Sequence, residues 1–291
     1  MDEQNNSDKN GSLYERANIK YREQLQLAMG SMFRALNRHR FNPKDFSIDQ
    51  LDVTVSNLDP VFEGYKIVQI SDIHMGHWIS PERIAGIVGL VNQQEPDIIV
   101  ITGDFVSYVF EEIREALTTA LQSLQPHEAV LAVLGNHDHW LGPEKVRLIL
   151  SDSGTQELAN DVYTVQRDGA QLHIAGVDDI IVGAADLDKV LDKLSDDAPA
   201  ILLAHEPDFA DESAATGRFF LQLSGHSHGG QVVIPGYGPM IRGPYFFKYP
   251  IGLYHVQDML QYTNRGIGTH VFRVRINCPP EITVIILHSE T

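Results

Sequence analysis

The stretch KIVQISDIHMG, residues 66–76, joins a short apolar run to a carboxylate and an imidazole. The run from Lys66 to Ile70 has the length and the β-branched composition of a buried strand. Asp72 and His74 follow it directly. Because loops at the ends of strands carry the ligand-binding groups of open α/β sheets, we expect both side chains at one edge of a sheet.

Four further stretches repeat this arrangement. Each places polar residues after an apolar run: Gly103-Asp104 after Asp97 to Thr102, Gly135-Asn136-His137-Asp138 after Ala129 to Leu134, His205 after Ala200 to Ala204, and Gly225-His226-Ser227-His228 after Phe219 to Leu223. Polar groups at five strand ends predict a single site along one edge of the fold.

The residue types and their spacing favour metal binding at this site. Side chains two apart in an extended chain project to the same side, so Asp72 with His74, and His226 with His228, would each present two groups to one small volume. The glycines that open three of the stretches would let the backbone turn sharply as it leaves a strand. Carboxylate, amide and imidazole ligands together suit Mn²⁺, Fe or Zn²⁺ better than they suit Ca²⁺ or a sulfur-lined zinc site.

In this order, D-x-H, GD, GNHD, H and GHxH resemble the motifs of the calcineurin-like metallophosphoesterase superfamily. The resemblance covers Ile48 to the C-terminus. Within it, SDIHMG at 71–76 and GHSHGGQ at 225–231 look like a bacterial phosphodiesterase branch whose members are usually associated with the membrane. The resemblance implies a four-layer α/β/β/α sandwich of two mixed sheets.

The resemblance also implies a role for each polar residue. Seven residues would hold two divalent ions: Asp72, His74 and His228 on the first, Asn136, His205 and His226 on the second, and Asp104 between both. His137 would bind no metal and would stand beside the scissile phosphate as the general acid.

Charge arithmetic supports the same chemistry. Two divalent ions roughly 3.5 to 4 Å apart bind a bridging water and lower its pKa from about 16 toward neutrality, which leaves a hydroxide aimed at phosphorus. The charge of the ions exceeds that of Asp72, Asp104 and one hydroxide, so the site stays attractive to a phosphate ester. As the hydroxide attacks in line, the leaving oxygen needs a proton that His137 can donate.

Two alternatives stand beside hydrolysis. An Asp or Asn after a strand is an ordinary turn former or helix cap, and with 13 histidines some lie near strand ends by chance. The same fold also serves as a non-catalytic scaffold when ligands are lost, but here every ligand position of the motifs is filled. His77 and His139 lie near motifs, and for them a substrate contact and a plain loop position both remain open.

Length and composition agree with one enzyme domain at 45–291 preceded by an extension at 1–44. The chain of 291 residues is 43% hydrophobic, which is ordinary for a globular protein with a large core. Its only cysteine, Cys278, excludes an intrachain disulfide.

Strand-like and helix-like runs alternate, which predicts the α/β class with a mixed α+β part. Helices are expected at 82–94, 111–124, 143–151 and 187–194. Strands at 162–166 and 172–177, with no helix between them, predict a second and more antiparallel sheet.

The N-terminal extension is basic, whereas the domain is acidic. Leu13 to His39 has an apolar stripe at helical spacing, and from Leu13 to Lys44 seven Lys or Arg accompany two acids. A basic amphipathic helix on an acidic body suggests peripheral contact with an anionic membrane, but packing of the helix on the domain or on a second subunit is slightly favoured. Since no apolar run approaches the roughly 18 residues of a membrane span, we expect a cytoplasmic location, with peripheral membrane attachment as the alternative.

Pro239 to Tyr254 bears on the substrate, because it is too apolar for a solvated loop and is broken by prolines. It follows GHSHGGQ, so it either walls the metal site, where an apolar lip would suit a lipid-linked phosphodiester, or packs on the core.

Several substrate classes are disfavoured. Phe105 and Val106 follow GD where the superfamily's protein phosphatases carry an arginine clamp, and Met75 replaces the tyrosine ligand of purple acid phosphatases. A net charge of −17 disfavours long nucleic acids as partners. A phosphodiester or pyrophosphate of modest size remains, with lipid-linked sugar nucleotides and cyclic nucleotides as alternatives.

Overall fold

The computed structural model describes residues 41–290, apart from 77, 108–110, 196 and 270–273. They belong to one compact unit, Phe41–Thr291. The predicted helix from Leu13 to His39 lies outside the described residues, as does His77. None of the helices in the described part of the chain has the length and apolarity needed to cross a bilayer.

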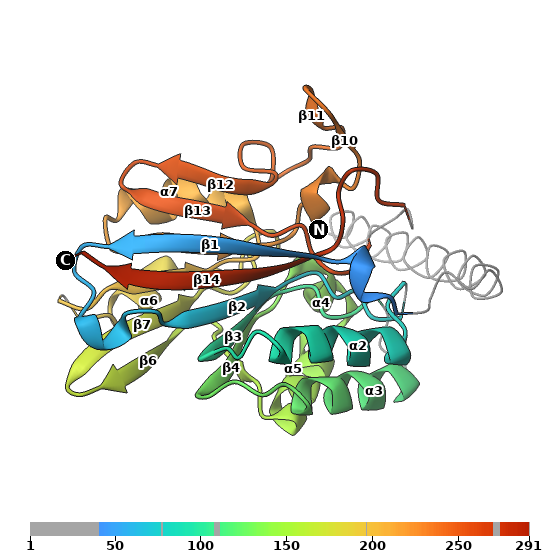
Figure 1. The fold of residues 1–291 in the computed structure, drawn as a ribbon, viewed down its shortest axis with the longest axis horizontal. Coiled ribbons are helices and arrows are strands. Elements are labelled where there is room, and N and C mark those ends of the chain that lie inside the picture. Colours follow the sequence, from blue (N-terminus) through green and yellow to red (C-terminus); the bar gives the residue numbers. More distant parts are fainter. Residues whose placement is uncertain (1–40, 77, 108–110, 196, 270–273, 291) are drawn as a thin grey trace, which may run out of the picture. The chain divides into compact units, whose positions relative to one another are not determined.

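The first sheet has six strands in the order β1-β14-β2-β3-β4-β5 (Figure 1). Their bounds are β1 Ser47–Val55, β14 Glu281–Ser289, β2 Lys66–Ile70, β3 Ile98–Thr102, β4 Ala129–Val133 and β5 Gln156–Glu157. Only β14 and β2 pair antiparallel. Because β2, β3 and β4 are parallel neighbours, the three motifs that follow them leave the sheet at the same edge.

The second sheet also has six strands, in the order β12-β13-β9-β8-β7-β6. Their bounds are β12 Gly252–Val256, β13 Met259–Thr263, β9 Leu221–Ser224, β8 Ala200–Leu203, β7 Ala170–Gly176 and β6 Asp161–Arg167. Its two outer pairs are antiparallel, against one antiparallel pair in the first sheet, as the sequence predicts. The parallel strands β8 and β9 bring His205 and the GHSH motif to one edge.

Helices cover the outer faces of both sheets. They are α2 Pro81–Asn92, α3 Glu111–Gln122, α4 Asn136–Leu141, α5 Pro143–Ser153, α6 Leu187–Leu191 and α7 Ala210–Ala215, with 3₁₀ turns at Pro43–Asp45, Pro60–Phe62, Pro207–Phe209 and His228–Gly230. Helix α2 begins where its sequence indicates, because the Ser80 side chain accepts a hydrogen bond from Arg83 N and Pro81 occupies the first turn.

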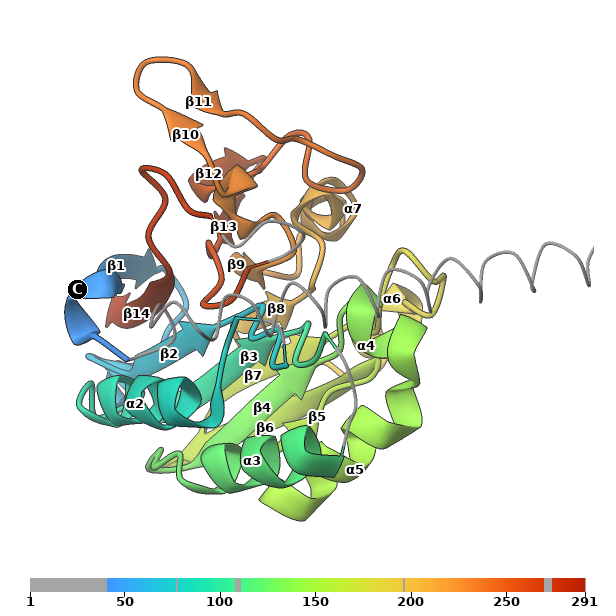
Figure 2. The same ribbon diagram turned by 90° about the vertical axis from the view of Figure 1, so that its right-hand side faces the viewer.

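Alternate residues of the central strands face different cores. In β3, Ile98 and Val100 pack between the two sheets, whereas Ile99 and Ile101 pack against the helices of the first sheet. A third core lies between the second sheet and α6 and α7. Three cores separate four layers, so the predicted α/β/β/α sandwich is confirmed (Figure 2).

Several elements were not expected from the sequence. They are strands β1, β5, β12, β13 and β14 and helices α4 and α7, and β14 inserts between β1 and β2 from the far end of the chain. A small hairpin of β10 (Val233–Ile234) and β11 (Gly238–Pro239) projects beyond both sheets (Figure 1, Figure 2).

Candidate metal centre

The backbone at the predicted ligands is left-handed. Five of the seven have a positive φ: Asp72 at 52°, His74 at 47°, Asp104 at 57°, His226 at 66° and His228 at 50°. Such angles are uncommon for residues other than glycine and cost of the order of 1–3 kcal/mol each, so they concentrate where function requires them. The expectation that the D-x-H and H-x-H pairs are extended is therefore wrong.

At the glycines before the ligands, the absence of a side chain matters more than the freedom of the backbone to turn. Only Gly103, with φ of +91°, needs the left-handed region, and a Cβ there would lie 2.5 Å from His205 Nδ1. Gly225 has an ordinary φ, but a Cβ would overlap Ser71 Oγ and would lie 2.5 Å from Asp72 Oδ2. The missing side chains let loops from both sheets approach each other closely.

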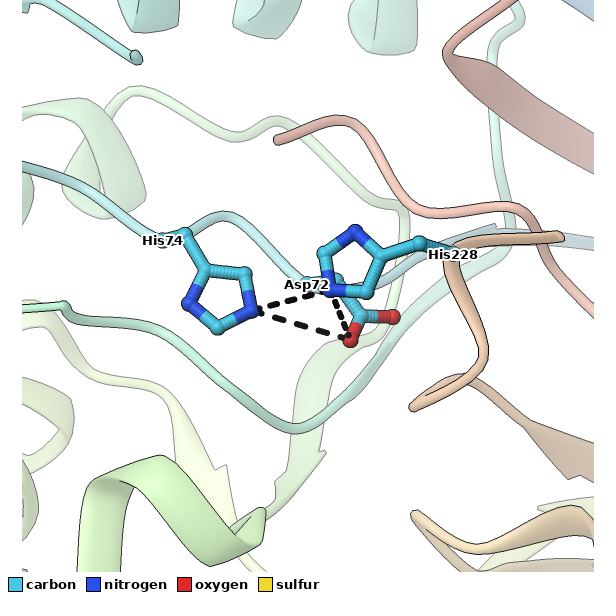
Figure 3. Close-up of side chains that lie close together, drawn as sticks. All are labelled: Asp72, His74 and His228. Carbon is cyan, nitrogen blue, oxygen red and sulfur yellow. Dashed lines mark hydrogen bonds and ion pairs between the residues drawn. The ribbon is translucent and has the colours of Figure 1, made fainter. Parts of the chain in front are cut away.

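Asp72, His74 and His228 form the first cluster (Figure 3). Asp72 Oδ1 lies 3.3 Å from His228 Nε2 and 4.0 Å from His74 Nε2, and the two imidazole nitrogens are 3.0 Å apart. All three residues are buried. The H-x-H motif does not chelate as a unit, because His228 alone faces this cluster.

Asp104 connects the first cluster to a second one. Its Oδ2 lies 3.4 Å from His74 Nε2 and 3.3 Å from His205 Nε2. Its Oδ1 accepts a hydrogen bond of 3.0 Å from the backbone N–H of His137. One carboxylate thus faces imidazoles from both sheets, which is the position expected of a bridging ligand.

The second cluster contains His205, His226 and Asn136. His226 Nδ1 lies 3.1 Å from Asn136 Oδ1, and the rings of His205 and His226 are 5.1 Å apart. His205 Nδ1 lies 2.7 Å from the carbonyl oxygen of Thr102. When the ring is neutral and donates that N–H, Nε2 carries the lone pair and faces the site, as is usual for histidines that bind metal.

His137 lies at the edge of both clusters and is only partly buried. Its ring meets that of His74 edge to face at 4.8 Å. A ring nitrogen also lies within 4.8 Å of ligand atoms of His74 and Asp104, so the geometry alone permits metal binding as well as a contact with substrate. Burial lowers the pKa of His137, although the charge of Asp104 opposes this effect.

Burial and mutual charge shift the pKa values of the other site residues. Burial raises the pKa of Asp72 to about 7 and lowers that of His226 to about 3. Burial alone would raise the pKa of Asp104 and lower that of His205. The attraction between the two groups is the stronger effect, so the pKa of Asp104 lies well below its usual range and the pKa of His205 lies well above. A cation among these groups would relieve both kinds of cost.

The donor set fits divalent ions. Asp72 Oδ1 and His205 Nε2 are buried without a hydrogen bond of good geometry, although each faces polar groups. Buried polar atoms in native proteins normally have partners, so these two atoms are suited to bind a cation. Imidazole, carboxylate and amide oxygen are ligands of Mn²⁺, Fe and Zn²⁺. The residues of both clusters would hold such ions.

Two acidic residues escaped the sequence predictions. Asp138 accepts hydrogen bonds from the backbone N–H groups of Phe105 (2.9 Å), Val106 (3.3 Å) and Gly135 (3.0 Å), so it joins the GD and GNHD loops. Asp138 is the last residue of the GNHD motif, so its place in the motif was a usable signal. Glu206 offers an oxygen near His205 and His226, and its Oε1 is buried without a hydrogen bond.

Arg275 also supports the site from a distance in sequence. Its guanidinium donates to the carbonyl oxygens of Arg265, Gly266 and Gly268, at 2.7 to 3.0 Å. That segment binds the D-x-H loop through the N–H of Gly268, which donates to Asp72 O. No local pattern marks such a tertiary contact.

The structure also shows the surroundings of His139 and of the apolar segment 239–254. His139 Nε2 lies 2.7 Å from Asp178 Oδ1, so its ring is engaged in an ion pair, and the residue lies in helix α4 and not in a loop. The apolar segment 239–254 does both things considered for it: Phe246 packs edge to face on His226 at 5.2 Å, and Tyr249 and Tyr254 pack on the third core.

Comparisons with known proteins agree with this geometry. A family model for calcineurin-like phosphoesterases matches residues 65–230. The uncharacterized metallophosphoesterase YkuE of Bacillus subtilis is 36% identical over 231 residues, covering 78% of this chain and 80% of YkuE. The phosphodiesterase YaeI of Escherichia coli is 30% identical over 226 residues, 77% of this chain and 82% of YaeI. A bovine transmembrane protein with a metallophosphoesterase domain is 31% identical over 260 residues, 84% of this chain and 57% of its own length.

Proposed function

The chain belongs to the calcineurin-like phosphoesterase family and is a metal-dependent phosphoesterase, and we propose that it hydrolyses a phosphodiester or pyrophosphate of modest size with two divalent ions. One observation carries the proposal. The Asp104 carboxylate lies between an imidazole of the first cluster and one of the second, at 3.4 and 3.3 Å. A carboxylate in that position serves two ions at once.

Each ion has its own set of protein ligands in this proposal. Asp72, His74 and His228 hold the first, and Asn136, His205 and His226 hold the second. The ions would be Mn²⁺, Fe or Zn²⁺, because nitrogen and oxygen donors are mixed. When bound, such a pair of ions activates water as the nucleophile and neutralises charge on the phosphate.

His137 is the proposed proton donor to the leaving oxygen. Its backbone N–H is fixed on Asp104 Oδ1, and its ring lies against His74 at the partly exposed edge of the site. A bound phosphate places negative charge beside the ring, which opposes the effect of burial and favours the protonated imidazole. The proton would then pass from the ring to the oxygen that leaves phosphorus.

The sequence around the site supports a diester over a monoester. Ser107, whose Oγ lies 3.3 Å from His74 Nδ1, follows the GD motif in a stretch without arginine, so the clamp for a dianionic phosphate is absent from this place. The similar protein of Escherichia coli is named a phosphodiesterase.

Hydrolysis of bis-p-nitrophenyl phosphate tests the proposal. The full-length protein should hydrolyse it with added Mn²⁺, should lose turnover in EDTA, and should regain it when metal is restored. p-Nitrophenyl phosphate serves as the monoester control and should react more slowly. Metal binding without turnover of either ester would favour the scaffold alternative.

A further inference from the structure

The large apolar side chains exposed by the described residues are concentrated in one segment, residues 234–247, which we call the apolar lip. Its exposed members are Ile234, Tyr237, Met240, Ile241, Tyr245 and Phe247. Tyr237 and Phe247 are 73% and 64% exposed, and this is too much for residues that serve the core. Single exposed apolar residues are common, but six of them within residues 234–247 indicate a segment that binds something.

The segment is fixed in this exposed position by bonds at its base. Asp208 accepts hydrogen bonds from the backbone N–H groups of Phe247 (2.9 Å) and Lys248 (3.0 Å). At the other end, Met240 N donates to Val232 O at 2.9 Å. The hairpin within the apolar lip projects beyond the two sheets (Figure 2). Its apolar side chains are therefore presented outward by the fold.

The apolar lip begins six residues after His228 and contacts the metal centre. Gly230, two residues after His228, has φ of +67°, and a Cβ there would lie 2.7 Å from Ile241 O. Phe246 contacts the ring of His226. A partner bound by the apolar lip would therefore lie beside the metal centre.

Charge identifies the kind of surface. The segment from 213 to 257 contains no acidic residue, in a chain whose net charge is −17, although Asp208 lies at the base of the apolar lip and Lys248 pairs with Asp211. Within the apolar lip the only charged residue is Arg242, which makes no ion pair with any other described residue. The acidic remainder of the protein repels an anionic surface, whereas this part can approach one.

We propose that the apolar lip docks on an anionic lipid bilayer. Tyrosine and phenylalanine beside an arginine are the side chains that favour the boundary between headgroups and acyl chains. A second copy of the chain is a poorer occupant, because a two-fold contact through the apolar lip would bring two copies of Arg242 into one interface. If the proposed hydrolysis is also correct, docking delivers the metal centre to phosphoesters carried by lipids.

Vesicle binding by the full-length protein tests this inference. Sedimentation should show binding to vesicles of phosphatidylglycerol and phosphatidylcholine, and weaker binding to phosphatidylcholine alone or at high salt. Tyr237→Ser with Phe247→Ser should reduce binding roughly tenfold or more. The matched control is Leu148→Ser with Val182→Ser, two exposed apolar residues outside the apolar lip, which should bind like the wild type.

Three results would overturn the inference. One is absence of binding by the wild type, and another is undiminished binding by the double variant of the apolar lip. In the second case, Arg34→Glu with Arg38→Glu should abolish binding, which would assign docking to the N-terminal extension. The third is a dimer in sedimentation velocity that the lip substitutions dissociate. Turnover of bis-p-nitrophenyl phosphate should be unchanged in the lip variant, so docking and hydrolysis can fail separately.

Discussion

The metal centre and the apolar lip invert the usual distribution of side chains in opposite ways. The metal centre buries carboxylates and imidazoles, among them Asp72 and His205, whereas the apolar lip exposes Tyr237 and Phe247. Either arrangement is unfavourable for folding alone. Such departures from the general rule are expected where a ligand is to be bound, so each region indicates its own kind of ligand.

The two regions differ in how the fold maintains them. The metal centre is held by left-handed backbone angles and by close contacts between loops of two sheets, as at Gly103 and His205. The apolar lip is attached to the fold through Asp208, Val232 and the contact of Phe246 with His226, while its outer side chains stay exposed. We therefore expect chemistry and stability to depend on the metal centre, and location to depend on the apolar lip.

The largest effect is expected from Asp104→Asn. An amide cannot bridge two cations with negative oxygens, so turnover of bis-p-nitrophenyl phosphate should fall by about 10³-fold or more. Vesicle binding should not change, because Asp104 is buried and the substitution leaves the exposed side chains of the apolar lip as they are. Turnover within tenfold of the wild type would contradict a bridging role for Asp104. It would also contradict the expectation that chemistry depends on the metal centre.

His137→Gln should have the next largest effect. Loss of a proton donor typically lowers kcat by about 10²- to 10⁴-fold. Metal content, measured by inductively coupled plasma mass spectrometry, should stay at the wild-type value. The control is Trp140→Phe, which alters the exposed ring 5.0 Å from His137 and should retain most activity. Loss of metal in His137→Gln would instead make His137 a ligand.

Asp138→Ala should separate stability from chemistry. It leaves three buried backbone N–H groups without an acceptor, so the free energy of unfolding should fall by roughly 3 kcal/mol in urea titrations. Asp138→Asn is the matched control, because its carboxamide oxygen still accepts from Phe105 and Val106, and it should lose less. Equal stability of both variants and the wild type would mean that this carboxylate does not hold the two loops.

The smallest effect on stability is expected in the apolar lip. Tyr237→Ser removes an exposed ring, so the free energy of unfolding should change by no more than about 0.5 kcal/mol. Denaturation in urea at matched metal content would measure it. A loss of more than about 2 kcal/mol would show that the ring serves the fold, and the contrast between the two regions would weaken.

The sequence predicted those features that depend on local patterns. Lys66–Ile70 is the observed β2, and the other four strands before the motifs differ from prediction by at most two residues at an end. The four layers also follow from the motifs and their family resemblance. All seven predicted ligands and His137 lie at one edge of the fold.

Features that depend on distant contacts could not be predicted. The left-handed angles at Asp72 and His226 are uncommon outside glycine. Asp and His adopt them more readily than most residues, but the sequence does not mark which of its many Asp and His residues will do so. The insertion of β14 beside β2 joins segments more than 200 residues apart. Composition marked 239–254 as apolar, but only the fold decides that Phe246 turns inward and Phe247 outward.

Calorimetric titration of Mn²⁺ into chelator-stripped, full-length protein tests the central claim most directly, because it counts ions. The wild type should bind two ions per chain, and Asp104→Asn should bind fewer or bind both much more weakly. A wild type that binds one ion or none, or an Asp104→Asn variant that binds two as tightly as the wild type, would contradict a shared pair of ions at this site.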